Sequence, residues 1–268
     1  MTYRVTMETE ASPNGTAYAT DASALVDCLV AQNENYLRRV VGRDFGSNPA
    51  VPLLANANAR RAVEPFGHFF WRTIPLVIEK GGDDVEILAW VIAERRVRFG
   101  EDVRPTMVPT LPALGGTVKV TLERHAFNGS EDAQESIEDL ASMLDCLNAM
   151  NAGFFRRTVG QDYGRNTAVP LIYASGVRYA EEPVGAEFWR TVPIVLRYGE
   201  ADCEDLSSWL VEEKRVRFGL KDARAIIIPQ FREPTVVRPK GSYLYHIQGW
   251  SPDVPGGVDD PSRRMGMT

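Results

Sequence analysis

The stretch LRRVVGRDFGSNPAVPLL (37–54) occurs a second time in the chain, as FRRTVGQDYGRNTAVPLI (155–172). In the same register, FWRTIPLVI (70–78) matches FWRTVPIVL (188–196). So many identities at one spacing exclude chance, and the chain is therefore a tandem duplication. The shift from residue 37 to residue 155 far exceeds the period of solenoid repeats, which is about 20 to 50 residues. Each copy is predicted to form a domain or a large half-domain.

A third matched pair follows with one more residue of offset, AERRVRFG (93–100) and EEKRVRFG (212–219). Between the copies, LPALGG (111–116) supplies a proline and two glycines, which are typical of a connection between structured segments. We therefore expect a first domain over residues 1–113 and a second over residues 117–268. The two copies should pack pseudo-symmetrically, in an arrangement that the sequence does not specify.

Each copy shows the same order of hydrophobic patterns. An alternating strand is followed by a long helix with apolar residues at helical spacing, then by the FWRT element and a second helix that ends in VRFG. Gly100 and Gly219 are well placed as the glycines that terminate this second helix. The strands are expected at 3–8 and 118–123, the long helices at 22–41 and 135–159, the second helices from about 84 and 203, and a further strand at 223–230. This order predicts an α+β fold.

Composition restricts the classes of partner. The chain has 268 residues, 44% of them hydrophobic, and a formal net charge of -6. This acidic balance argues against a nucleic-acid or anionic-membrane partner, and the cluster of Arg95, Arg96 and Arg98 is interpreted as a solvated helix face. The opening MTYRVTMETEAS has acids where a signal peptide would be apolar, and no run reaches the ~18 apolar residues of a membrane span. We expect a cytoplasmic protein.

The chain has three cysteines, at positions 28, 146 and 203. They form neither a disulfide framework nor a cluster with zinc-site spacing, so we expect no structural metal and no cofactor. Cys28 and Cys146 occupy matching positions in the two long helices, beside leucines. They are interpreted as small buried hydrophobic residues.

Cys203 has no counterpart in the first copy. The second copy reads GEADCEDLSSW (199–209) and the first GGDDVEILAW (81–90), so that Asp84 stands where Cys203 does. The second copy also carries a tail, residues 231–268, with His246 in SYLYHIQGW and the pair Asp259 and Asp260 in VDDPS. A cysteine, a histidine and an aspartate thus occur together in one copy.

These three residue types suit nucleophilic catalysis. A thiol with a pKa near ~8.5 becomes a good nucleophile when an imidazole takes its proton, and a carboxylate orients that imidazole. The start of a helix also favours a thiolate at Cys203. Asp202 and Asp205 resemble a capping pair, but their charges and that of Glu204 oppose a thiolate. Taken singly, Cys203 is also compatible with an inert helix start, and His246 with a structural role on a strand.

The second copy resembles the transglutaminase-like (papain-like) cysteine proteinase superfamily. The residues that carry the resemblance are FWRTVP (188–193), GEADCEDLSSWLVEEKRVRFG (199–219), YHIQ (245–248) and DDPS (259–262). They are most similar to bacterial and phage-encoded members with a GDCEDxA-type motif. The first copy resembles the same superfamily weakly, without a nucleophile, and GEADCED lacks the glycine that usually precedes the motif.

The resemblance implies two tandem domains in which helices pack on a small antiparallel sheet. It assigns Cys203 as nucleophile, His246 as general base and Asp260 as orienting acid, with Asp259 as the adjacent alternative. Backbone N–H groups near Cys203 are the expected oxyanion donors. No metal or cofactor takes part in this chemistry.

Two functions follow as hypotheses. The first is a thiol acyl-transfer enzyme, a cysteine peptidase or amidase or a transglutaminase, that acts on a protein or peptide substrate. The second is a structural protein of a phage virion or its assembly, built on a degenerate transglutaminase-like fold. It would bind other phage structural proteins or copies of itself, and it would be virion-associated. Neither hypothesis requires a nucleic acid or a membrane.

Overall fold

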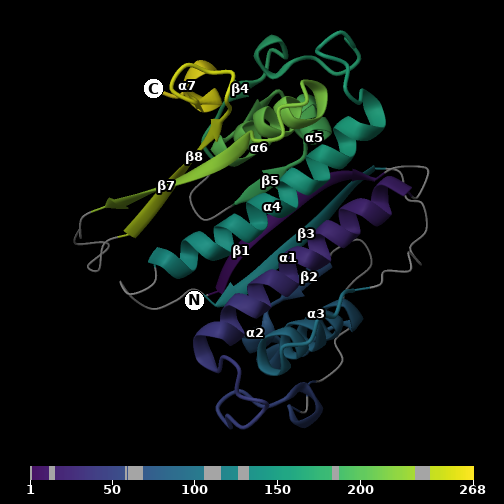
Figure 1. Cartoon of the computed structure of the whole chain (residues 1–268), viewed down its shortest axis with the longest axis vertical. Coiled ribbons are helices and arrows are strands. Elements are labelled where there is room, and N and C mark those ends of the chain that lie inside the picture. The colour runs from purple at the N-terminus through teal and green to yellow at the C-terminus, as the bar shows by residue number, and fades with distance from the viewer. Residues whose placement is uncertain are drawn as a thin grey trace.

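The computed structural model describes residues 2–11, 16–57, 59, 69–105, 116–125, 133–182, 187–232 and 242–268. The helices are α1 (Thr16–Val40), α2 (Ile74–Lys80), α3 (Asp84–Glu94), α4 (Ala133–Thr158), α5 (Val192–Tyr198), α6 (Cys203–Glu212) and α7 (Pro261–Arg264). The strands are β1 (Thr2–Ala11), β2 (Phe69–Arg72), β3 (Gly116–His125), β4 (Arg178–Tyr179), β5 (Phe188–Arg190), β6 (Glu200–Ala201), β7 (Arg224–Arg232), β8 (Ser242–Trp250) and β9 (Val258–Asp259). The predicted α+β class is confirmed, and the long helices and the strands over 223–230 and 242–250 lie where the sequence predicts them (Figure 1).

The central sheet is shared by the two copies. Its strand order is β2-β3-β1-β5, in which β1 of the first copy pairs antiparallel with β3 of the second. Each FWRT strand pairs in parallel with the opening strand of the other copy, β2 with β3 and β5 with β1. The expectation of one antiparallel sheet in each copy is therefore wrong for this sheet, which is mixed and draws two strands from each. Of the expected boundary, residues 111–115 lie outside the described residues, and the division into two domains stays a prediction.

The pairing has an internal two-fold symmetry. Thr6 pairs with Thr121, Thr6 also aligns with Phe188, and Thr121 aligns with the matching Phe70. The hydroxyl groups of Thr6 and Thr121 lie 3.0 Å apart. Because each opening strand meets its own equivalent, the duplication supplies both halves of one sheet.

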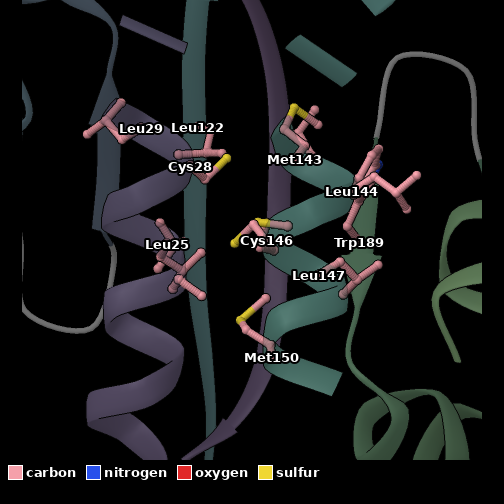
Figure 2. Packing of buried hydrophobic residues seen from close by; sticks show 14 of the residues in the cluster. Leu25, Cys28, Leu29, Leu122, Met143, Leu144, Cys146, Leu147, Met150 and Trp189 are labelled. Atoms are coloured by element: carbon pink, nitrogen blue, oxygen red, sulfur yellow. The ribbon is translucent and has the colours of Figure 1, made fainter. Parts of the chain in front are cut away.

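The long helices α1 and α4 pack against each other and cover the sheet (Figure 1). Alternate residues of β1 and β3 point into this core, which Figure 2 shows from close by. Cys28 and Cys146 face one another between the two helices and are buried, as the sequence predicts. Burial, together with the nearby Cys28 thiol, raises the pKa of Cys146 well above its usual range. These two thiols are packing residues.

Each FWRT element turns directly from strand into helix. A proline in the first turn fits the start of α2 and α5, because its missing N–H would have no helical partner there. The backbone N–H of Ile74 donates to Asn33 of α1 at 2.9 Å, and that of Val192 donates to Asn151 of α4 at 2.9 Å. The matching asparagines therefore tie each short helix to the long helix of its own copy.

The repeated loop is held by a buried arginine in each copy. Arg98 and Arg217 lie in π-helical turns at the ends of the second helices, and both side chains are fully buried. Arg217 donates to both carboxylate oxygens of Asp162, at 2.7 and 2.8 Å, and to the Val169 carbonyl at 2.9 Å. Arg98 makes the matching contact with the Val51 carbonyl. The interpretation of Arg98 as part of a solvated face is therefore wrong, since it anchors the loop.

The second copy continues into a small antiparallel sheet in the order β7-β8-β9, and α6 packs against β8. None of the helices in the described segments is both long and apolar enough to cross a membrane. Cys203 begins α6, His246 lies in β8 of this small sheet, and Asp260 caps the start of α7.

Candidate functional site

Helix α6 begins at Cys203, as the sequence predicts, and every one of its residues is buried. Its apolar side chains join the core, and its polar side chains have specific partners. Ser208 accepts a hydrogen bond from Asn151 at 2.9 Å, and Asp205 accepts one from the Arg190 backbone N–H at 2.6 Å. A residue at the start of α6 therefore stands on a rigid, fully packed element.

The first turn of α6 lies against β8. The Ser207 hydroxyl donates to the Ile247 carbonyl at 2.7 Å. One turn earlier, the backbone of Ile247 lies beside the Cys203 sulfur and acts to lower the pKa of this thiol. The structure thus brings Cys203 to the residue next to His246 in the strand.

His246 and Asp260 form a hydrogen-bonded pair. The Nε2 atom of His246 lies 2.9 Å from Oδ2 of Asp260. Gln248 donates to the same oxygen at 3.0 Å, and Asp260 also caps α7 by accepting from the Arg263 backbone N–H. A carboxylate fixed in this way holds an imidazole in one orientation and leaves Nδ1 for a proton transfer.

Asp259 has a different environment. It is buried, accepts a hydrogen bond from the Tyr173 hydroxyl at 2.7 Å and pairs with Arg264 at 3.2 Å. Burial and the Asp259 carboxylate raise the pKa of Tyr173. Of the two aspartates that the sequence leaves open, Asp260 is the one that contacts His246.

The Cys203 thiol makes its hydrogen bond to Glu204 and not to His246. The Sγ atom of Cys203 donates to Oε2 of Glu204 at 2.9 Å, and within the described residues no hydrogen bond joins Cys203 to His246. Burial, followed by the charges of Glu204 and Asp202, raises the pKa of the Cys203 thiol well above its usual range, and the smaller opposing effect of Ile247 does not offset them. Cys203 is therefore held as a protonated thiol in this arrangement.

The two copies differ at the start of the second helix. In the first copy, Asp83 accepts from the backbone N–H groups of Val85 and Glu86, and Glu86 accepts from Asp83 N–H, which completes a capping box. Asp202 makes no such side-chain cap among the described residues. The predicted pairing of Asp202 with Asp205 is therefore wrong. Asp205 and Glu86 both accept from the backbone N–H of the arginine in the FWRT element, but Glu86, which is one methylene longer, also accepts from the N–H of the residue before its helix.

Sequence reasoning missed two further acids beside the site. Burial, followed by the Glu204 charge, raises the pKa of Glu187 to about 8. Burial raises the pKa of Glu182 to about 7 in spite of Arg190, whose Nη2 lies 3.3 Å from its carboxylate. In the sequence, the one sign of these two acids is the run AEEPVGAEF (180–188), which places acidic residues just before a buried strand.

The described residues contain no group of three or more His, Cys, Asp or Glu side chains that could hold a metal ion. No family model, curated protein or solved structure matches the chain. The chemistry of the site therefore rests on its own residues: a buried thiol, a histidine–aspartate pair on the adjoining strand, and a helix start without a side-chain cap.

Proposed function

We propose that the protein is a thiol acyl-transfer enzyme of the transglutaminase-like, papain-like class, a cysteine peptidase or amidase or a transglutaminase. Cys203 is the nucleophile, His246 the general base and Asp260 the residue that orients it. The observation that carries the proposal is the 2.9 Å contact between His246 Nε2 and Asp260 Oδ2. The next residue of the His246 strand, Ile247, lies beside the Cys203 sulfur.

In this reaction the Cys203 sulfur attacks the carbonyl carbon of an amide, and its proton passes to Nδ1 of His246. The C–N bond then breaks, and the departing amine takes that proton. Water releases the acyl group in a peptidase or amidase, and a second amine releases it in a transglutaminase. Asp260 holds the imidazole through Nε2 and stabilises its charged form.

The start of α6 supports this proposal. In the first copy, a side chain occupies the N–H groups of the first helical turn, whereas Asp202 makes no such cap. Uncapped N–H groups beside a nucleophile suit the stabilisation of an oxyanion. The first copy then serves as scaffold, because β1 carries β5 and the Glu8 carbonyl accepts from Thr191 N–H at 3.0 Å.

The experiment compares the wild-type protein with the Cys203→Ala and His246→Ala variants. Release of peptides and incorporation of a labelled amine are measured on protein and peptide substrates, and Cys146→Ala is the control for loss of an ordinary buried thiol. Activity that survives Cys203→Ala would end the proposal.

A second candidate is a virion or assembly structural protein on a degenerate transglutaminase-like fold, bound to other phage structural proteins or to itself. The observation that favours it is the protonated, buried thiol without a bond to His246. In that case a thiol probe should label Cys203 no faster than a free cysteine, and the protein should be a stoichiometric component of a particle.

A further inference from the structure

Glu204 is the direct partner of the Cys203 thiol. The two residues are adjacent in the first turn of α6, and Sγ donates to Oε2 at 2.9 Å. Their exposed fractions are 8% and 4%, so little water reaches the contact. Hydrogen bonds to a carboxylate in a poorly hydrated site are stronger than those between neutral groups.

This carboxylate is absent from the copy that lacks the thiol. Asp84 and Val85 of the first copy stand where Cys203 and Glu204 stand in the second. The rest of the motif keeps an acid at the helix start and another in its first turn in both copies. Cys203 and Glu204 therefore occur as a pair.

The groups that face the thiol are predominantly acidic. Glu204 and the N-cap residue Asp202 act directly on the thiol, and Tyr179 of β4 lies near it. Glu182 and Glu187, from the segment before β5, lie near Glu204. Arg190 is the nearby cation, and it pairs with Glu182, Glu8 and Asp205. None of the described lysine or arginine side chains pairs with Glu204. The thiol proton therefore has a carboxylate acceptor that pairs with no cation of the described segments.

We infer that Glu204 is a positioning residue that holds Cys203 as a thiol in the resting state. The contact keeps the proton on sulfur and directs it away from His246. This inference rests on the proposed reaction, in which the thiol must break its hydrogen bond with Glu204 before its proton can pass to Nδ1 of His246. The resting state differs in this way from a preformed thiolate–imidazolium pair.

The test measures the ionisation of the thiol and needs no substrate. The full-length wild-type protein and Glu204→Gln are alkylated with iodoacetamide from about pH 5 to 10, and the rate at Cys203 is followed by peptide mass spectrometry. Glutamine keeps the size of the side chain but removes its charge. A neighbouring charge shifts a pKa by about 1 to 3 units, so we expect Glu204→Gln to label about tenfold faster or more at pH 7.5.

Glu212→Gln is the matched control, because Glu212 is a buried glutamate two turns further along α6 and pairs with Arg215. Its labelling profile should equal that of the wild type. The inference is overturned if Glu204→Gln labels at the wild-type rate throughout. It is also overturned if the wild type labels rapidly and independently of pH between about pH 5 and 7, a result that does not require Glu204→Gln to fold. Either result leaves the catalytic proposal to its own test, because labelling does not measure turnover.

Discussion

The hydroxyl groups of Thr6 and Thr121 lie 3.0 Å apart at the centre of the ten-residue pairing between β1 and β3. The two residues occupy equivalent positions in the two copies. The two copies therefore share one sheet, and its two central strands come from different copies, β1 from the first and β3 from the second.

The second copy should consequently not form a stable monomer by itself. In a fragment of residues 117–268, β5 loses β1 and β3 loses its antiparallel partner. We expect the fragment to dimerise through β3 or to remain unfolded, as size-exclusion chromatography with light scattering and circular dichroism would detect. A folded monomeric fragment would contradict the shared sheet.

Replacing Arg217 with alanine should destabilise the protein strongly. The side chain is fully buried and bound to Asp162 and two loop carbonyls, and its bonds lower the pKa of Asp162. Removing one partner of a buried ion pair costs about 3–5 kcal/mol, which urea unfolding measures. Arg215→Ala, at a half-buried position two residues earlier, serves as the control and should cost much less.

The free energy of unfolding should fall as the pH rises from about 5 to 8. Glu182 and Glu187 have pKa values raised from 4.5 to about 7 and about 8, so the folded state binds protons that the unfolded state has lost. Their contribution is fully present below pH 4.5 and is lost as the pH passes through 7 to 8. Glu187→Gln should reduce this slope and raise the melting temperature at pH 8. An unchanged slope would show that Glu187 is charged in the folded protein.

Substitutions of the two aspartates in the DDPS motif should have different effects, one mainly on activity and the other mainly on stability. Asp260→Asn alters the group that orients His246, and we expect turnover to fall by about 10²–10⁴-fold with small loss of stability. Asp259→Asn weakens the bonds to Tyr173 and Arg264, and should cost about 1–3 kcal/mol of stability with turnover largely kept. Urea unfolding and activity are measured on both variants. The reverse outcome would assign the orienting role to Asp259.

Much of this architecture follows from local sequence patterns. Helical spacing predicts the long helices, and the glycine position predicts the end, at Gly100, of the π-helical turn that follows α3. The comparison of the copies isolates Cys203 and leads to His246 and the adjacent aspartates. These features depend on nearby residues, which a sequence displays directly.

The pairing of strands and the state of the thiol could not be predicted in the same way. Each opening strand could pair with a strand of its own copy or with a strand of the other copy. The choice depends on contacts between residues far apart in sequence. The capping box of the first copy requires the longer Glu86 side chain, which reaches both Arg72 N–H and Asp83 N–H, and the Cys203–Glu204 contact depends on burial. Each is a property of the packed structure.

The formation of an acyl-enzyme tests the central claim most directly. The wild-type protein is mixed with an excess of p-nitrophenyl acetate, and the rapid release of p-nitrophenol is measured together with the intact mass. The proposal predicts a burst that approaches one equivalent and an acetyl group on Cys203, both lost in Cys203→Ala and greatly slowed in His246→Ala. A burst that is absent, or that persists in Cys203→Ala, would contradict it.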